Sequence, residues 1–441
     1  MNILIIGHTT LHWGRMEYGN IGNYYIIEPL IRELHATFPN AIIRTTLQMS
    51  KRFCEDENLI VLPMELYYDF NCDENLKVAQ KEIELVNEFL SVGSFSETTP
   101  YIDEVMAADI IIDFSGDIWG ENANLLGKDR FEVGLYKDLV AQKLGKPTFM
   151  LAGSPGPFYN EESKKLAKEV FKNFTLITNR EPLSTEILRE DGFDVSRVQN
   201  LACPSFLFET TKNEEVKELL EKEVLFNESK PIVGFVICGW NFPDGPFDKW
   251  PREDNDYEVF AKAVEYVSNN LGAKVCLLSH SNGFLVPPAQ FKLIHGRDYP
   301  IIKQLQNVLQ KRGLAKDVYT LDEVYDPWTT KAIISNFDML ISGRVHAAVA
   351  GFSQYIPTVV IDYGHEPKAH KLQGFARLVG QERFISNPSL EDDLTDKINS
   401  CWISRIEVRE ELKKRIPFIK NMAKENFRLL KLHSIKNFGD S

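Results

Sequence analysis

A short stretch of the chain, residues 340–351, combines side chains that could bind an anion and move a proton. Apolar residues typical of a β-strand lead into Gly-Arg-Val-His at residues 343–346, and a helix-like run follows. Arg344 offers a planar cation to a phosphate or carboxylate, and His346 can carry a proton near neutral pH. The first N–H groups of a helix also favour an anion. We therefore expect an active centre here; the alternative is that Arg344 forms a structural ion pair and His346 is a satisfied buried histidine.

Two asparagines near the N-terminus follow the expected first strand. Residues 17–27 read Glu-Tyr-Gly-Asn-Ile-Gly-Asn-Tyr-Tyr-Ile-Ile, and a helix-like run comes next. The two glycines would let the backbone approach a ligand closely. Their spacing matches neither G-x-G-x-x-G nor a P-loop, so it does not indicate a dinucleotide or a nucleoside triphosphate. We predict a ligand site that includes Asn20 and Asn23.

Two further strand ends carry polar residues. Within residues 112–120 a strand ends in a small-residue turn with Asp117, which could bind a hydroxyl or belong to a plain turn. Within residues 177–188 a strand ends at Arg180, and a helix begins near Pro182, a residue suited to a first helical turn. Arg180 would project from this strand end into a cleft between domains, or form a salt bridge, for instance with Glu181.

A fourth loop, residues 362–371, follows a strand that should lie beside the strand before Arg344. In a parallel sheet the two loops lie at the same edge, where ligands bind. The sequence therefore predicts that Lys371 or Lys368 brings a second cation to the site of Arg344.

The elements that position these residues alternate as in an α/β protein. Short β-branched runs recur between longer amphipathic stretches, which predicts parallel strands with helical crossovers. In the first half we expect strands at residues 3–6, 41–47, 109–114, 147–151 and 176–178 and helices at residues 75–90, 132–144 and 161–171. In the second half we expect strands at residues 231–237, 274–279, 338–342 and 358–361 and helices at residues 257–271, 301–312 and 329–336.

The length of the chain requires more than one core. Single cores stop growing at about 250 to 300 residues, and this chain has 441. A charged stretch rich in lysine and glutamate, residues 210–230, marks the expected junction. The predicted fold is α/β, with two doubly wound, Rossmann-like domains and a cleft between them. The domains are placed at residues 1–212 and 231–403, with a linker at 213–230 and a helical tail at 404–441.

Charge and cysteine content exclude several classes of protein. With 63 acidic and 50 basic residues the net charge is −13, which argues against general affinity for nucleic acid. The six cysteines are scattered without a C-x-x-C pair, so we expect reduced thiols and no structural zinc. Asp254 and Asp256 fit the acidic start of a helix better than a metal site. No apolar run approaches the ~20 residues that span a bilayer, and the first residues read as a strand, so we expect a cytoplasmic protein.

The tail of the chain is basic. Residues 404–436 hold ten basic and four acidic side chains, and the pattern predicts one or two helices interrupted by Pro417. A basic helix of this kind could rest on an anionic membrane surface, which would give peripheral membrane association. A solvated helix face is the simpler interpretation.

The ordered set of motifs resembles the polysaccharide pyruvyl transferase family over about residues 3–380. The motifs that carry the resemblance are Gly19-Asn20-Ile21-Gly22, then Asn179-Arg180-Glu181 with Ser184 and Leu188, then Ser342-Gly343-Arg344-Val345-His346. Each motif is short, and only their order is specific. The resemblance implies a two-domain fold like that of GT-B glycosyltransferases. It also implies that a pyruvyl group moves from phosphoenolpyruvate to two hydroxyls of a sugar in a cell-surface polysaccharide or its precursor, forming a ketal.

The resemblance implies a donor site made of Arg180, Arg344 and His346, with Val345 contributing its backbone. The neighbouring Gly343 and Lys371, which fits the family's late lysine better than Lys368, are expected there too. The residue types agree, because phosphoenolpyruvate carries about three negative charges and needs a planar or bidentate cation for each anionic group.

His346 is the candidate general acid, which would protonate the methylene carbon of the donor. Arginines can stabilise the developing charge, so we expect no metal and no cofactor, with phosphoenolpyruvate as a co-substrate. On the acceptor side, Asn20, Asn23 and Asp117 are expected to contact a glycan or a lipid-linked oligosaccharide.

Two other functions fit the same architecture, since a fold does not fix a function. One is a GT-B glycosyltransferase with a nucleotide-sugar donor, which would need a carboxylate for the ribose and a stacking site for the base. The other is a catalytically silent carbohydrate-binding relative.

Overall fold

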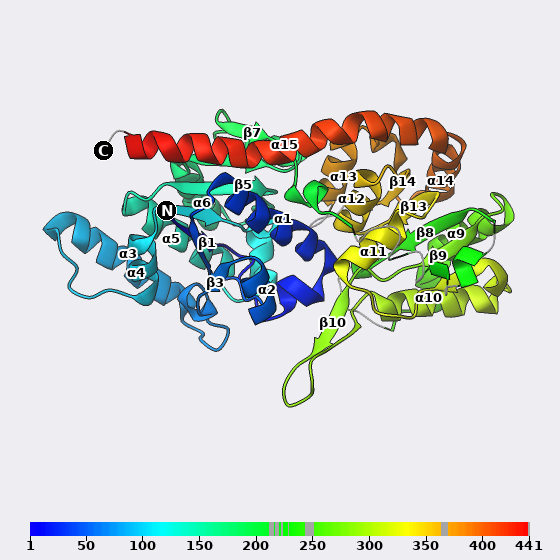
Figure 1. Cartoon of the computed structure of the whole chain (residues 1–441), viewed down its shortest axis with the longest axis horizontal. Helices are drawn as coiled ribbons and strands as arrows, with labels where there is room; N and C mark the ends of the chain where they lie inside the picture. The colour runs from blue at the N-terminus through cyan, green and yellow to red at the C-terminus, as the bar shows by residue number, and fades with distance from the viewer. Residues whose placement is uncertain are drawn as a thin grey trace. The chain divides into compact units, whose positions relative to one another are not determined.

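The computed structural model describes residues 1–210, 216, 220–221, 224–227, 229–242, 251–362 and 369–439 (Figure 1). The chain divides into two compact units. The first contains Met1–Met16, Glu28–Pro204 and Asn421–Ser441, and the second contains Glu17–Ile27 and Ser205–Lys420.

The first unit is built on a parallel sheet with the strand order β3-β2-β1-β4-β5-β6-β7. The order reverses between β1 and β4, as in a doubly wound sheet, where ligands bind beyond the carboxyl ends of the strands. β4 and β5 are buried along their whole length, which explains their continuous apolar runs. The strands are β1 (Asn2–Ile6), β2 (Ile42–Thr45), β3 (Leu59–Val61), β4 (Ile110–Asp113), β5 (Thr148–Gly153), β6 (Leu176–Asn179) and β7 (Val198–Asn200).

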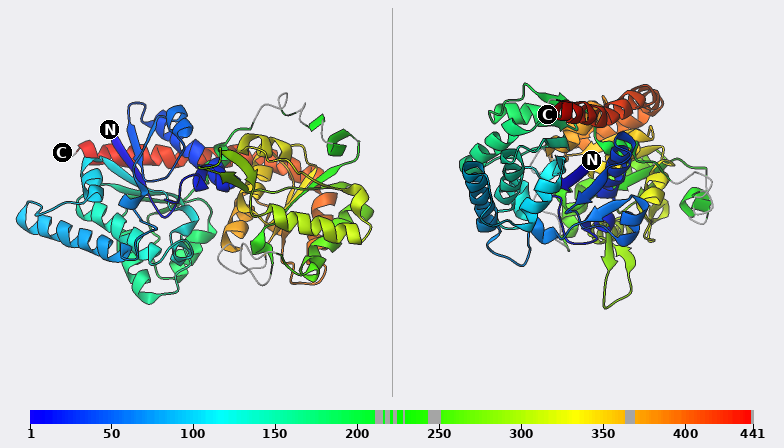
Figure 2. Two further views of the ribbon diagram at one scale, coloured as in Figure 1. Left: turned by 90° about the horizontal axis from the view of Figure 1, so that it is seen from below. Right: turned by 60° about the vertical axis from the view of Figure 1, so that its left-hand side comes forward.

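Helices cover both faces of this sheet (Figures 1 and 2). The first helix, α1 (Ile21–Thr37), begins in the second unit and ends in the first. The others are α2 (Lys51–Asp56), α3 (Asn75–Val92), α4 (Pro100–Ala107), α5 (Arg130–Lys143), α6 (Glu161–Asn173) and α7 (Leu183–Glu190). Short helical turns are η1 (Arg15–Gly19), η2 (Met64–Leu66), η3 (Gly116–Ile118), η4 (Glu121–Leu125) and η5 (Pro204–Leu207).

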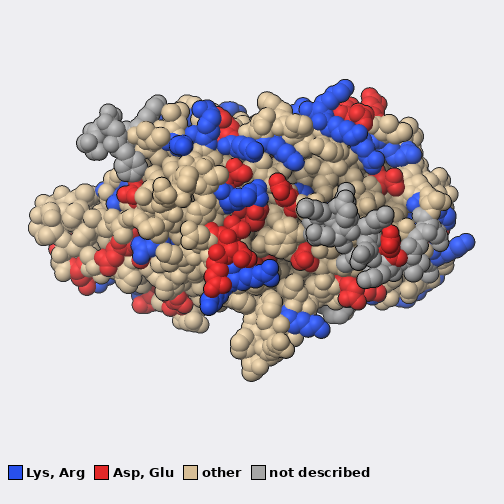
Figure 3. Space-filling view, viewed as in Figure 1, with Lys and Arg blue, Asp and Glu red and all other residues tan. Residues whose placement is uncertain are grey.

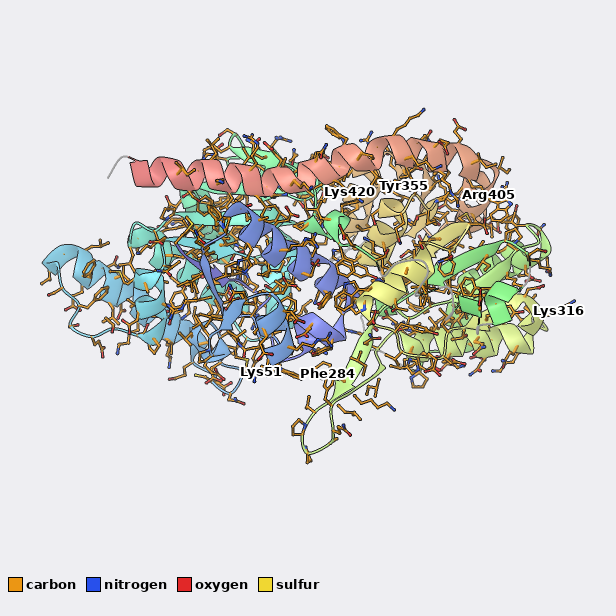
Figure 4. All side chains as sticks on the ribbon, viewed as in Figure 1. Lys51, Phe284, Lys316, Tyr355, Arg405 and Lys420 are labelled. Carbon is orange, nitrogen blue, oxygen red and sulfur yellow. The ribbon has the colours of Figure 1, made fainter. Side chains whose placement is uncertain are left out.

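The second unit repeats the doubly wound pattern with the strand order β12-β9-β8-β13-β14-β15. Its strands are β8 (Ile232–Val236), β9 (Lys274–Leu277), β12 (Val318–Thr320), β13 (Met339–Ser342), β14 (Thr358–Ile361) and β15 (Ile385–Ser386). A separate antiparallel hairpin, β10 (Asn282–Leu285) and β11 (Lys292–His295), projects from this unit. Phe284 marks the hairpin in Figure 4.

Helices separate the strands of the second unit along the chain, and two further helices follow its last strand, β15. The helices are α9 (Glu258–Asn269), α10 (Tyr299–Lys311), α11 (Pro327–Ile334), α12 (Val345–Ser353), α13 (Ala369–Leu378), α14 (Asp393–Ile403) and α15 (Arg405–Gly439). Short turns are η6 (Val224–Asn227), η7 (Gly239–Asn241), η8 (Asp254–Tyr257), η9 (Ala315–Asp317) and η10 (Glu382–Phe384).

The prediction of two doubly wound α/β halves is confirmed, and each predicted strand and helix has a counterpart. The elements that the sequence did not predict include the short edge strands (β3, β7, β12 and β15), the hairpin, and the helices α2, α4, α13 and α14. Asp254 and Asp256 lie in η8, at the helix start that was expected.

The predicted interruption of the tail at Pro417 is wrong, because α15 continues through this residue. Ile416 and Ile419 on either side are fully buried, so tertiary packing holds the helix where proline removes a hydrogen bond. Figure 4 labels Arg405 at the start of α15 and Lys420, the last residue counted with the second unit.

The division into units differs from the predicted domains in three places. Residues 17–27 are counted with the second unit, the second unit resumes at Ser205 and not after residue 212, and the tail is shared between the units. Much of the predicted linker, residues 213–230, lies outside the described residues.

Within the described part of the chain, no helix is both long and apolar enough to cross a membrane. Lys and Arg side chains stand out along α15 in the space-filling view (Figure 3).

Candidate active site

The joint between β13 and α12 has the predicted strand-to-helix form. β13 ends at Ser342, whose hydroxyl accepts from the backbone N–H of Arg344 at 3.2 Å and donates to its carbonyl at 2.9 Å. Arg344 keeps an extended backbone, and α12 begins at Val345. His346 therefore lies in the first turn of a helix at the carboxyl end of a central strand. The N–H groups of this turn have no partner within the helix and favour an anion.

Gly343 has a packing role in this joint. The side chain of Asn241 lies so close that a Cβ on Gly343 would be 2.1 Å from its amide atoms. The Asn241 amide donates to the Gly343 carbonyl at 3.1 Å and accepts from the backbone N–H of Cys238 at 2.8 Å. This amide thus ties the loop after β8 to the loop after β13.

Arg344 forms a two-point ion pair with Asp298. The Nε and Nη2 groups of Arg344 donate to the carboxylate at 2.8 and 2.5 Å. Asp298 is fully buried, while 14% of the Arg344 side chain is exposed. The backbone N–H of Asp298 donates in turn to the Ser281 hydroxyl at 3.0 Å. Arg344 therefore forms the structural ion pair that the sequence analysis gave as an alternative role. The pair also fixes the orientation of the guanidinium.

The N-terminus of α1 packs directly against His346. Asn20 caps this helix, since its side-chain oxygen accepts from the backbone N–H of Gly22 at 3.1 Å and its amide donates to Asn23 at 3.3 Å. A Cβ on Gly22 would lie 2.6 Å from the Cβ of His346, so only glycine fits. Two helix N-termini, those of α1 and α12, thus meet at the imidazole, which strengthens the preference for an anion.

The placement of Asn20 and Asn23 corrects an expectation. Both were predicted within the first, acceptor-side domain, yet they belong to the second unit together with Arg344 and His346. The physical reason is the close packing of Gly22 on His346, a contact between residues far apart in the sequence. Both asparagines are half-buried.

Lys371 lies in the first turn of α13 and is fully buried. One helical turn further along, Phe375 contacts the imidazole of His346, with ring centres 6.2 Å apart. Residues one turn apart share a helix face, so Lys371 is on the side of α13 that faces His346. The alternative lysine, Lys368, lies outside the described residues.

Two buried residues beside this joint, Tyr25 and His280, were not singled out in the sequence. His280 follows β9 and is fully buried, and its ring lies 5.5 Å from the ring of Tyr25 in an edge-on arrangement. Burial, and then the charges of Arg344 and His346, lower the pKa of the His280 imidazole well below its usual value. The sequence carried no signal for either residue beyond the strand end before His280.

In the first unit the structure brings together Arg180 and Asp117. Arg180 follows β6 and is almost fully buried, and its Nη2 lies 3.8 Å from a carboxylate oxygen of Asp117. Its Nε donates to the Ser154 hydroxyl at 2.8 Å. Gly116 adopts a φ of +58°, which gives the turn that carries Asp117. The salt bridge considered for Arg180 therefore exists, with Asp117 as a partner.

Arg180 and Asp117 belong to the first unit, and Arg344 and His346 to the second. That Arg180 shares one donor site with the other two residues stays a prediction.

A buried polar cluster at the ends of β1 and β4 was also missed. The Nδ1 of His8 lies 2.8 Å from the Ser115 hydroxyl, which donates to Asp113 at 2.9 Å. Burial, and then the charge of Arg130, lower the pKa of His8 to about 3. Burial raises the pKa of Asp113 to about 6, and burial followed by the charge of Asp113 raises the pKa of Asp138 well above its usual value. The cluster therefore keeps its histidine neutral and favours the protonated form of Asp138.

The two doubly wound halves place the protein in the GT-B fold class. HepE of Anabaena, solved with UDP, is similar over 100% of both chains, with a TM-score of 0.56 and 13% identity. The UDP-GlcNAc 2-epimerase of Neisseria meningitidis is similar over 99% of this chain and 100% of that one, with a TM-score of 0.53 and 12% identity. At these identities the likeness shows the fold alone.

Residues 20–365 match the polysaccharide pyruvyl transferase family, and the chain belongs to that family. The matched range contains Arg180, Arg344 and His346, whereas Lys371 lies beyond it. The amylovoran biosynthesis protein AmsJ of Erwinia amylovora is 23% identical over 433 residues, which cover 94% of this chain and 95% of that protein. The predicted family is thus confirmed, and membership supports a transferase role in polysaccharide biosynthesis.

Proposed function

We propose that the protein transfers the pyruvyl group of phosphoenolpyruvate to two hydroxyls of a sugar in a polysaccharide or its precursor. The observation that carries this proposal is the meeting of two helix N-termini at His346, beside the oriented guanidinium of Arg344. Family membership supports the same reaction. The arrangement suits a small anion whose reaction requires a proton.

In the proposed reaction His346 protonates the methylene carbon of the donor, which becomes the methyl group of the product. The donor C2 is then electrophilic, and a sugar hydroxyl adds to it and loses its proton. Phosphate leaves as the second hydroxyl adds and passes on its proton, which closes the ketal ring. General acid catalysis of this kind contributes about 10²- to 10⁴-fold.

The remaining residues have binding roles in the proposal. Arg344 and the first turn of α12, including Val345, bind the donor, and Gly343 keeps that loop closely packed. Arg180 and Lys371 are proposed to neutralise further donor charge. Asn20, Asn23 and Asp117 are proposed to contact the acceptor, a glycan or lipid-linked oligosaccharide. The reaction as written needs no cofactor.

The test is to incubate the protein with phosphoenolpyruvate and glycans that contain galactose, mannose or N-acetylmannosamine. We expect phosphate release together with a gain of one pyruvyl group in the mass of the glycan. His346→Ala should lower the rate by about 10²-fold or more. The matched control, His12→Ala, changes an exposed histidine of the first unit and should leave the rate unchanged.

Two outcomes would contradict parts of the proposal. An unchanged rate in His346→Ala would exclude the acid role of this residue. Thermal protection by a nucleotide sugar without protection by phosphoenolpyruvate would favour a GT-B glycosyltransferase, because a ligand that binds only the folded protein stabilises it.

A further inference from the structure

Two buried polar side chains beside the candidate site, those of Tyr25 and His280, have no hydrogen-bond partner in the described part of the chain. Both ring nitrogens of His280 and the hydroxyl of Tyr25 lack one among the described residues, although the side chains are 0% and 1% exposed. Buried polar groups in proteins are nearly always hydrogen-bonded, because an unpaired one loses its hydration without compensation. Two adjacent exceptions indicate a ligand that supplies the missing partners.

Tyr25 belongs to α1, and His280 packs on the same face of this helix as His346. Gly22 contacts His346, and Tyr25 contacts His280. Residues three positions apart share a helix face, so both imidazoles pack on one face of α1, about one turn apart. This geometry places His280 next to the anion-binding helix ends.

Hydrogen bonds join the loop of His280 to Arg344. The next residue, Ser281, accepts from the backbone N–H of Asp298, and the Asp298 carboxylate accepts from Arg344. Ser281 also forms an antiparallel bridge with Asn20, which caps α1. His280 is therefore held in the same framework as the donor-binding arginine.

The ionisation of both groups suits them to donate hydrogen bonds. Burial, and then the charges of Arg344 and His346, lower the pKa of His280, which keeps the imidazole neutral with one N–H group. Burial raises the pKa of Tyr25 well above its usual value, so the hydroxyl keeps its proton. One N–H and one O–H donor match the oxygens of an anion.

We propose that His280 and Tyr25 are further donor-binding residues, which donate hydrogen bonds to an oxyanion group of phosphoenolpyruvate. This inference rests on the proposed function, since it names ligands of the same site. Tyr25 and His280 have no partner for these groups within the described chain, and the donor would supply one to each when it binds.

The test separates binding from folding. Tyr25→Phe removes only the hydroxyl, and His280→Leu removes both ring nitrogens. Neither change breaks a hydrogen bond that the described part of the chain makes, so the unfolding free energy should be unchanged or higher. The dissociation constant for phosphoenolpyruvate, measured by calorimetry, should rise about tenfold or more in each variant, as expected for a lost hydrogen bond to a charged group.

Two further variants serve as controls. Tyr67→Phe removes a hydroxyl of the first unit that is equally buried and without a partner in the described chain, and it should leave the affinity unchanged. His280→Gln keeps an N–H donor and should recover part of the lost affinity.

The outcomes distinguish this inference from the proposed function. If the wild-type protein does not bind phosphoenolpyruvate, the proposed function fails, and inorganic phosphate then tests the oxyanion site. Phosphate that stabilises the wild type but not Tyr25→Phe would support the inference. Dissociation constants within about twofold of the wild type in both variants, or no response of the wild type to either anion, would overturn it.

Discussion

Arg344 combines a structural contact with a position suited to a ligand. Its two-point bond to the buried Asp298 fixes the plane of the guanidinium, and the side chain stays partly exposed. Catalytic and binding sites need side chains that are held in place before the ligand arrives, because ordering them later costs affinity. The ion pair is therefore compatible with donor binding, and the two interpretations of Arg344 do not exclude each other.

His8 gives a pH dependence that can be tested at the scale of one residue. Its pKa is about 3 in the folded protein, against 6.5 as the ordinary value. The unfolded chain therefore binds a proton that the folded protein does not, and the contribution of His8 to stability is lost as the pH falls from 6.5 towards 3. This contribution is measured as the difference in unfolding free energy between the wild type and His8→Gln. The difference should decrease by about 1.4 kcal/mol for each unit by which the pH falls within this window.

Urea denaturation of the wild type and of His8→Gln at several pH values checks this expectation. The neighbouring Asp113 changes stability in the opposite direction. Its pKa is raised to about 6, so its contribution to stability is lost as the pH rises through 6. Asp113 is present in both proteins, so its contribution largely cancels in the difference. Parallel curves for the two proteins would show that His8 keeps its ordinary pKa.

The candidate site is built from the ends of helices and strands, not from their middles. α12 begins at the carboxyl end of β13, and α1 begins against His346. A helix end offers unpaired N–H groups, and a strand end in a doubly wound sheet opens to a crevice. The joint therefore combines rigid support with N–H groups that have no partner within their own helix.

Gly22 makes this contact possible, and Gly22→Ala tests it. Alanine normally favours a helix over glycine by about 0.5 to 1 kcal/mol. Here the added Cβ would meet His346, so α1 or the imidazole must shift. We expect pyruvyl transfer to fall by about 10²-fold, the effect of a small misplacement of a reacting group, with helix content retained.

Activity assays and circular dichroism of Gly22→Ala measure these two effects. A second test compares the stability cost of Gly22→Ala in the wild type and in His346→Gly. The cost should be smaller when His346 is absent, since the two side chains are in contact. If Gly22→Ala lowers the unfolding free energy equally in both proteins, the added Cβ does not act through its contact with His346.

At the scale of the whole chain, both units depend on segments from the opposite end of the sequence. Residues 17–27 complete the site of the second unit, and the end of α15 packs into the first. There the buried amide of Asn426 accepts from Thr178 and donates to the carbonyl of Ala202. Neither unit is a continuous piece of chain.

Asn426→Ala tests the last of these contacts. It leaves the Thr178 hydroxyl and the Ala202 carbonyl buried without this partner, so the unfolding free energy should fall by about 1 to 3 kcal/mol. Lys431→Ala changes an exposed residue of the same helix and should have little effect. A chain that ends at Lys420 should lose more stability, since it also removes the buried Phe427 and Leu430. Denaturation curves that match the wild type would show that the first unit is stable without α15.

Local patterns in the sequence determined the doubly wound α/β class, the central strands and most of the long helices, and the joint of β13 and α12 that carries Arg344 and His346. These features depend on periodicity and on residues close together in the chain, which the sequence displays directly. The tertiary structure alone decided that Asp298 orients Arg344, that Gly22 packs on His346, and that His280 and Tyr25 lie beside them. Those contacts join residues that are distant in sequence, and they are set by how strands order and helices pack.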